Sequence, residues 1–180
     1  MKGMELRTER LILREFRLDD EAAVHRYGSD EEVTQYTTWG PNSLAETAAY
    51  LSKVVRIAAR EPRTSFTLAV ATLDDELIGV ASLTITDAGS TGELGYVLAR
   101  DSWGRGYATE VACRLIDFGF NELGLRRITA TCHPDNVTSA RVLEKAGLHF
   151  EGTIQDDLRV RGGWRLFAIA VGDEVAGRPD

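Results

Sequence analysis

The chain alternates between two kinds of hydrophobic pattern. Residues 11–17 mix apolar and polar side chains, as a half-buried strand does, whereas the apolar residues of 43–58 recur at helical spacing. On these criteria the predicted strands are 11–17, 66–71, 77–86, 93–98, 127–133, 150–158 and 164–171. The predicted helices are 20–27, 43–58, 109–121 and 136–146. The segment 30–39 is shorter and only partly helical in character.

The connections between these elements favour an antiparallel sheet. Strands 66–71, 77–86 and 93–98 follow one another through short turns, and Asp74 and Asp75 are typical hairpin residues. Helices precede and follow this group. The order therefore predicts an α+β fold, with a central, mostly antiparallel, twisted sheet of about seven strands flanked by about four helices.

Composition places the chain among ordinary globular proteins. It has 180 residues, 43% of them apolar and 27% charged, and its net charge of −7 argues against a general nucleic-acid binder. We expect a single domain over residues 1–172 and a frayed polar tail over 173–180. There is no signal-peptide pattern and no apolar stretch of transmembrane length, so we expect a cytoplasmic protein without a membrane partner. Cys113 and Cys132 lack metal-ligand spacing, and no metal ion is expected.

A glycine-rich turn follows the third consecutive strand. Strand 93–98 leads through a polar segment into the turn 103–108 (WGRGYA), and a helix begins directly afterwards. Glycines let the backbone approach a ligand closely, and the N–H groups at a helix start favour an anion. The turn therefore predicts a phosphate-binding site. A dinucleotide-binding motif would need a third glycine where Thr109 stands, and a Walker loop would need Gly-Lys-Ser/Thr, so neither fits.

Three motifs follow one another from this turn onwards: 103–110 (WGRGYATE), 133–139 (HPDNVTS) and 143–148 (LEKAGL). In this order they resemble the GNAT superfamily of N-acetyltransferases. The opening 6–14 (LRTERLILR) resembles the RimJ/RimL branch, which includes enzymes that acetylate the N-termini of ribosomal proteins. The resemblance implies the GNAT fold, a homodimer, and acetyl-CoA-dependent transfer to a primary amine of a protein N-terminus or small molecule, by direct attack on the thioester. A catalytically inactive domain that binds or senses CoA is the alternative.

By the same resemblance, acetyl-CoA lies along strand 93–98 and the glycine turn. The backbone of Tyr96, Val97 and Leu98 pairs with the pantetheine arm, an N–H near Val97 and Leu98 binds the oxyanion, and the amides of 104–109 hold the pyrophosphate. The cofactor-binding residues so implied are Tyr96, Val97, Leu98, Trp103, Gly104, Arg105, Gly106, Tyr107, Ala108, Thr109 and Asn136. Glu110 would repel phosphate if it pointed inward, so we expect it to point outward.

Ser139 is the predicted catalytic residue on the second motif. Asn136, Ser139 and Leu143 share one helix face, so Ser139 can reach the sulfur if that face borders the cleft. The alternatives are a serine without a partner and, for Asn136, a simple helix cap. Leu143 stands where many family members carry a tyrosine that acts as the general acid. Because leucine has no proton to donate, either Ser139 or a water protonates the departing thiolate, or the thiolate leaves without assistance.

The general base and the acceptor pocket are predicted from position alone. Glu93 starts the strand that faces the acetyl group and can take a proton from the amine through a water, although a solvated strand residue is an equal alternative. Weaker candidates for the base are His133, Tyr96, Asp156 and Asp157. Tyr36 and Trp39 are predicted to line the substrate pocket, although the same aromatic cluster also fits an ordinary core.

Overall fold

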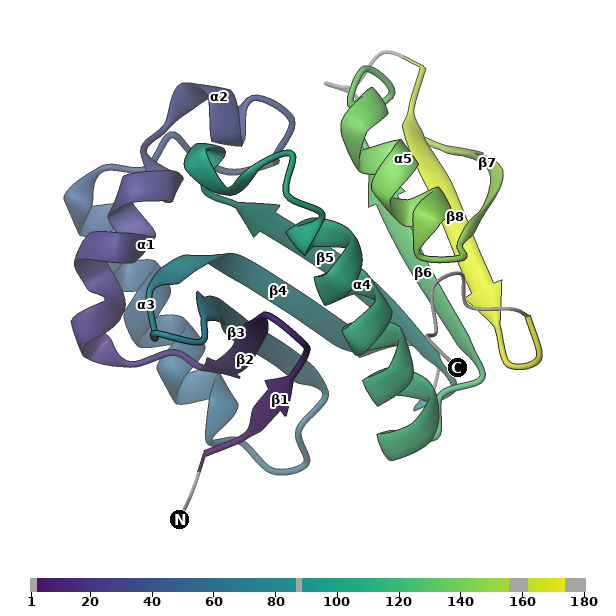
Figure 1. Ribbon diagram of the computed structural model, residues 1–180, viewed down its shortest axis with the longest axis horizontal. Helices are drawn as coiled ribbons and strands as arrows, with labels where there is room; N and C mark the ends of the chain where they lie inside the picture. Colours follow the sequence, from purple (N-terminus) through teal and green to yellow (C-terminus); the bar gives the residue numbers. More distant parts are fainter. Residues whose placement is uncertain (1–2, 87–88, 156–161, 174–180) are drawn as a thin grey trace.

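The computed structural model describes residues 3–86, 89–155 and 162–173, which form one eight-stranded sheet with helices on both faces (Figure 1). The strands lie in the order β1-β2-β3-β4-β5-β6-β8-β7. Their bounds are Glu5–Arg7 (β1), Leu11–Glu15 (β2), Ser65–Thr72 (β3), Leu77–Thr86 (β4), Thr91–Leu98 (β5), Arg127–Cys132 (β6), His149–Ile154 (β7) and Trp164–Ala170 (β8). The helices are Glu21–Gly28 (α1), Glu31–Thr34 (α2), Leu44–Ala58 (α3), Tyr107–Asp117 (α4) and Val137–Lys145 (α5), and α4 continues into a π-helical turn, Phe118–Glu122. None of the helices described is long and apolar enough to cross a membrane.

The sheet is divided where β5 and β6 meet. All other neighbouring strands pair antiparallel, whereas β5 and β6 run parallel and pair only over residues 91–93 with 127–129. Beyond these pairs β5 continues to Leu98 and β6 to Cys132, so the two strands separate towards their C-terminal ends. Figure 1 shows this divergence, with α4 beside β5 and α5 in front of β6 and β8. Separated strands leave backbone hydrogen-bonding groups without a strand beside them.

Two hydrophobic clusters hold the helices on opposite faces of the sheet. On one face α4 and α5 pack through residues that include Leu115, Ile116 and Leu143. On the other face α1 and α3 pack through Val24 and Leu51. Both clusters are built from the helical spacing of apolar residues that the sequence shows, so the two faces of the sheet are covered by different pairs of helices.

The described structure has eight strands and five helices, where about seven and four were predicted. The additional strand β1 has three residues, too few for a periodic signal, and forms because it pairs with β2 and buries Leu6. The segment 30–39 is helical only over α2, whose first N–H groups are capped by the Asp30 carboxylate. The strands, helices and antiparallel hairpins predicted elsewhere are confirmed within a few residues at their ends.

Two predicted segments reach outside the described residues. The predicted strand 150–158 is observed as β7, and its last part falls within residues 156–161. Most of the predicted tail, residues 174–180, also lies outside the described residues. Its first residue, Asp173, accepts a hydrogen bond from the N–H of Ala170 (2.9 Å) and so closes the end of β8.

Candidate active site

A cavity of about 1580 Å³ opens where β5 and β6 diverge. It is lined by β5, by the turn before α4, by β6 and α5, and by the segment between α1 and α3. Among the described residues, every predicted site residue lines this cavity except Arg105, whose side chain is exposed. Tyr36, Glu93 and Ser139, which are far apart in the sequence, are therefore brought to one place.

The strand β5 presents the backbone of every second residue to the cavity. In antiparallel pairs, alternate residues exchange hydrogen bonds with the partner strand and the others point away. The N–H of Ala99 donates to the carbonyl of Ile78 (2.8 Å), and the register between β4 and β5 has no shift. The backbone groups of Val97 therefore face β4, and those of Tyr96 and Leu98 face the cavity. Of the three residues expected to pair with pantetheine through the backbone, Tyr96 and Leu98 are so placed, whereas Val97 can contribute only its side chain.

The indole of Trp103 uses one of these outward groups. Its Nε1 donates to the carbonyl oxygen of Leu98 (2.8 Å) and folds the segment after β5 back onto the strand end. The N–H of Leu98 and both backbone groups of Tyr96 remain directed at the cavity. The sequence predicted Trp103 at the cofactor, but this contact, which shapes the strand end, was not predicted.

The glycine turn leads directly into α4. Gly104 and Gly106 have φ angles of 72° and 80°, the left-handed region that glycine adopts without strain. A Cβ at Gly104 would meet nothing within 4 Å, so backbone conformation and not crowding calls for glycine there. The first helical hydrogen bond runs from the N–H of Glu110 to the carbonyl of Gly106 (3.1 Å), so the preceding N–H groups of the first helical turn have no partner within the helix. Such a helix start is a site for an anion.

The side chain of Tyr96, on β5, contacts that of Ser139, on α5, across the opening between the two parts of the sheet. The Tyr96 hydroxyl lies 3.1 Å from the Ser139 Oγ, so the alternative of a serine without a partner is wrong. Burial raises the pKa of the Tyr96 hydroxyl well above its ordinary value and outweighs the opposing effect of the Ser139 hydrogen bond. Tyr96 is therefore a neutral phenol that can donate to Ser139. Asn136 caps α5, because its Oδ1 accepts the N–H of Ser139 (3.0 Å), and this bond fixes where Ser139 stands.

Glu93 lies at the base of the opening, on the other face of the sheet. It is the last residue of β5 that pairs with β6, opposite Thr129. Side chains alternate along a strand, and Leu94 is buried in the cluster under α4 and α5. Glu93 and Val97 therefore point to the face of α1 and α3, and Glu93 is exposed and lines the cavity. A carboxylate in this place can reach a ligand that enters from that face.

An aromatic group connects the two sides of the cavity. The ring of Tyr36 stacks on His133 with centroids 5.1 Å apart, and His133 contacts Trp164 edge to face at 5.9 Å. The Nδ1 of His133 accepts the N–H of Asp135 (3.2 Å), which favours a structural role for this histidine. Trp39 lines the cavity and is 38% exposed, so it is not part of the core.

The other candidates for chemistry add little to this arrangement. Burial raises the pKa of both Cys113 and Cys132, so both remain thiols, as expected of residues that are not nucleophiles. Asp156 and Asp157, the weaker candidates for the base, lie outside the described residues.

Comparisons with known proteins agree with this geometry. Residues 10–149 match the family described as "Acetyltransferase (GNAT) domain". A relative from Bacillus licheniformis, named uncharacterized N-acetyltransferase p20, is 33% identical over 158 residues, which are 87% of this chain and 89% of the relative. A solved GNAT-family acetyltransferase from Bacillus anthracis has a TM-score of 0.80 and 30% identity, covering 93% of this chain and 98% of that one.

The fold is also shared with a more distant protein. A structure of RimL, named as a ribosomal L7/L12 alpha-N-protein acetyltransferase in complex with coenzyme A, has a TM-score of 0.80 and 19% identity. The similarity covers 93% of this chain and 98% of RimL. At this identity the likeness concerns the fold.

Proposed function

Because the chain is an acetyltransferase of the GNAT family, we propose that it moves the acetyl group of acetyl-CoA to a primary amine, either a protein N-terminus or a small molecule. The amine attacks the thioester directly, without a covalent enzyme intermediate. One observation carries this proposal. The outward backbone of β5 and the glycine turn line the same cavity as Ser139 and Glu93.

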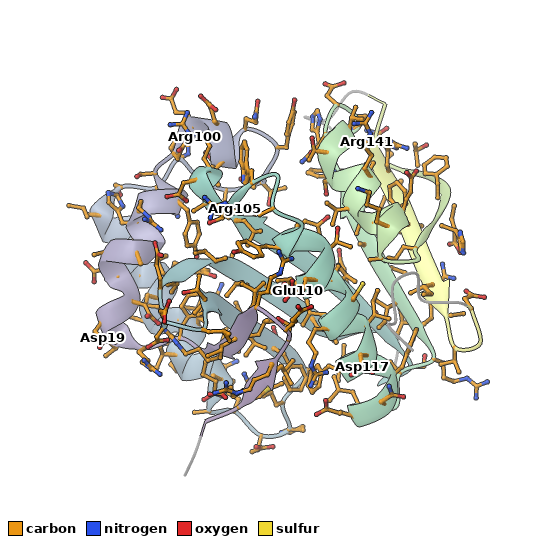
Figure 2. All side chains as sticks on the ribbon, viewed as in Figure 1. Asp19, Arg100, Arg105, Glu110, Asp117 and Arg141 are labelled. Carbon is orange, nitrogen blue, oxygen red and sulfur yellow. The ribbon has the colours of Figure 1, made fainter. Side chains whose placement is uncertain are left out.

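Successive parts of the cavity suit successive parts of acetyl-CoA, from the pyrophosphate to the thioester. The amides at the start of α4, from Tyr107 to Thr109, suit the pyrophosphate. The outward N–H and carbonyl of Tyr96 suit the two amides of pantetheine, as in strand addition. Arg141 and Lys145 line the cavity from α5 and add positive charge near an anionic ligand (Figure 2 shows Arg141 on this helix). The thioester then lies towards Ser139.

The residues at the thioester end have distinct roles in the transfer. The N–H of Leu98 points at the cavity and donates to the developing oxyanion, a contribution of about 3 kcal/mol for one donor. As the C–N bond forms and the C–S bond breaks, Ser139 donates a hydrogen bond to the departing thiolate, and Tyr96 donates to Ser139 in turn. A thiol pKa of roughly 8.5 lets the thiolate leave with this assistance.

Acetyl-CoA and the acceptor amine approach the opening from different faces of the sheet. The cofactor-binding elements α4 and α5 lie on one face, and Glu93 points to the other. The amine therefore approaches from the face of α1 and α3, past Tyr36 and Trp39, and meets the thioester in the opening. Glu93 takes the amine proton through a water, which leaves the nitrogen neutral for attack. This arrangement favours direct transfer in a ternary complex.

The proposal is tested by measuring thiol release. Purified protein is incubated with acetyl-CoA and a panel of amines that includes peptides with free N-termini, with the same peptides N-acetylated as matched controls. We expect release of CoA thiol that saturates with both substrates and is absent with the blocked peptides. Saturable CoA binding without thiol release for any amine would contradict the proposal and favour a binding or sensing domain.

A further inference from the structure

The turn between β1 and β2 holds the glycine turn from outside the cavity. The carboxylate of Glu110, in the first turn of α4, accepts hydrogen bonds from the Arg10 N–H (3.0 Å), the Arg10 Nε (2.8 Å) and the Thr8 hydroxyl. Arg10 Nη2 lies 2.6 Å from the same carboxylate. Figure 2 shows Glu110 on the part of α4 beside the β1–β2 hairpin. We call Thr8, Arg10 and Glu110 the hairpin clamp.

The clamp also contacts the backbone of the glycine turn. Arg10 Nη1 donates to the carbonyl oxygen of Arg105 (3.1 Å), and the guanidinium lies over the Tyr107 ring, 4.7 Å from its centroid. In a planar trans peptide the carbonyl and the next N–H point in opposite directions. By holding the Arg105 carbonyl, Arg10 therefore directs the N–H of Gly106 away from itself. Gly104, Gly106 and Tyr107 line the cavity, whereas Arg10 does not.

The clamp also determines the ionisation state of Glu110 in the first turn of α4. Burial alone would raise the pKa of Glu110, but the hydrogen bonds from Thr8 and Arg10 outweigh it and lower the pKa below its ordinary value. Glu110 is therefore ionised, and its negative charge lies in the helix turn that faces the predicted pyrophosphate. The side chain is only 17% exposed, so solvent screens it weakly, and Arg10 is the positive charge that neutralises it. Glu110 points outward, as expected from the sequence, because the clamp holds it there.

We propose that Arg10 is a positioning residue for coenzyme A, which orients the glycine turn and neutralises Glu110 without touching the ligand. The inference rests on the proposed function, because it takes the glycine turn to be the pyrophosphate site. It predicts that Arg10 contributes only to ligands that carry the pyrophosphate. Pantetheine lacks the pyrophosphate and provides the internal comparison.

The test is a calorimetric titration of CoA and of pantetheine into wild-type protein, Arg10→Ala and Arg7→Ala. Arg7 is the matched control, because it is an exposed arginine of the same hairpin that pairs only with Glu5 among the described residues. We expect Arg10→Ala to weaken CoA binding about tenfold, as loss of hydrogen bonds to a charged group does, and to leave pantetheine binding unchanged. Arg7→Ala should bind both ligands as the wild type does. In turnover, Arg10→Ala should raise the KM for acetyl-CoA and leave kcat within about twofold.

Two further variants separate orientation from charge. Arg10→Ala combined with Glu110→Gln removes the unneutralised carboxylate and should recover part of the CoA affinity. Arg10→Lys keeps the charge and should lie between wild type and Arg10→Ala. Unchanged CoA affinity in Arg10→Ala, or an equal loss for CoA and pantetheine, would overturn the proposal. Absence of CoA binding to the wild-type protein would instead overturn the proposed function itself.

Discussion

The two ends of the cavity are built in different ways. At the thioester end, Tyr96 and Ser139 meet across the divided sheet, and the Tyr96 phenol is buried enough to raise its pKa. At the other end, Gly104 and Gly106 form an exposed turn that is held from outside by Arg10. Groups that act on a reacting bond gain strength from exclusion of water. A phosphate site needs only fixed amides within reach of solvent.

This difference predicts which kinetic constant each end controls. Residues at the thioester end interact most strongly with the transition state, so their loss lowers kcat. Under the proposed function, residues at the turn bind the pyrophosphate equally in the ground state and the transition state, so their loss should raise the KM for acetyl-CoA. Variants at each end therefore test whether the two ends are separate in function.

The largest effect is expected for Ser139→Ala. This change removes the hydrogen bond that we propose to the departing thiolate and should lower kcat about 100-fold, with CoA affinity little changed. Steady-state kinetics with saturating acetyl-CoA measure it, and Ser52→Ala is the control, because Ser52 is an exposed serine of α3. An unaltered kcat would remove Ser139 from the mechanism.

Gly106→Val should have the next largest effect, at the other end. A β-branched residue is strained at φ 80°, so the turn loses its shape and the KM for acetyl-CoA should rise about 20-fold while kcat is kept. Gly124→Val is the matched control, since Gly124 has a similar φ of 68° and lies after the π-helical turn. If both variants raised the KM equally, general strain and not the phosphate site would be the cause.

A smaller effect is expected for Glu93→Gln. An amide cannot take the amine proton, so kcat should fall about tenfold, less than for a buried base because an exposed carboxylate acts through water. Affinity for CoA should be the same as in the wild type. Glu21→Gln, an exposed glutamate at the start of α1, serves as the control. If the Glu93→Gln variant had the wild-type kcat, Glu93 would have no role as a base and would be only a solvent-exposed strand residue.

The smallest effect is expected for Arg105→Ala. Only the carbonyl of Arg105 is held by the clamp, and its side chain is exposed and outside the cavity lining. The KM for acetyl-CoA should therefore change by no more than about twofold, as for other exposed charges. If the KM for acetyl-CoA rose as much as in Gly106→Val, the Arg105 side chain would have to contact the phosphate.

The sequence predicted the elements whose hydrophobic pattern is long, and the order of the sheet's hairpins followed from short turns. The glycine turn was predicted because its residue types are dictated locally, by φ and by the helix start. The strand β1 was not predicted, because three residues are too few to show a periodic hydrophobic pattern. The hydrophobic pattern alone does not show where β5 and β6 diverge, because residues 94–98 look like any continuing strand.

Contacts between distant residues were also beyond the sequence pattern. The bond between Tyr96 and Ser139 joins residues 43 positions apart, and the bond between Arg10 and Glu110 joins residues 100 apart. Neither pair has a spacing that periodicity can detect, because each depends on how the sheet brings its strands and helices together. The sequence therefore predicted both ends of the cavity, but not what holds them in place.

The most direct test of the account is a crystal structure of the protein with coenzyme A bound. We expect electron density for the pyrophosphate at the N–H groups of 107–109, for pantetheine along the outward backbone of Tyr96, and for the sulfur beside the Ser139 hydroxyl. Coenzyme A bound elsewhere, or bound at the turn with its thiol directed away from Ser139, would contradict the account.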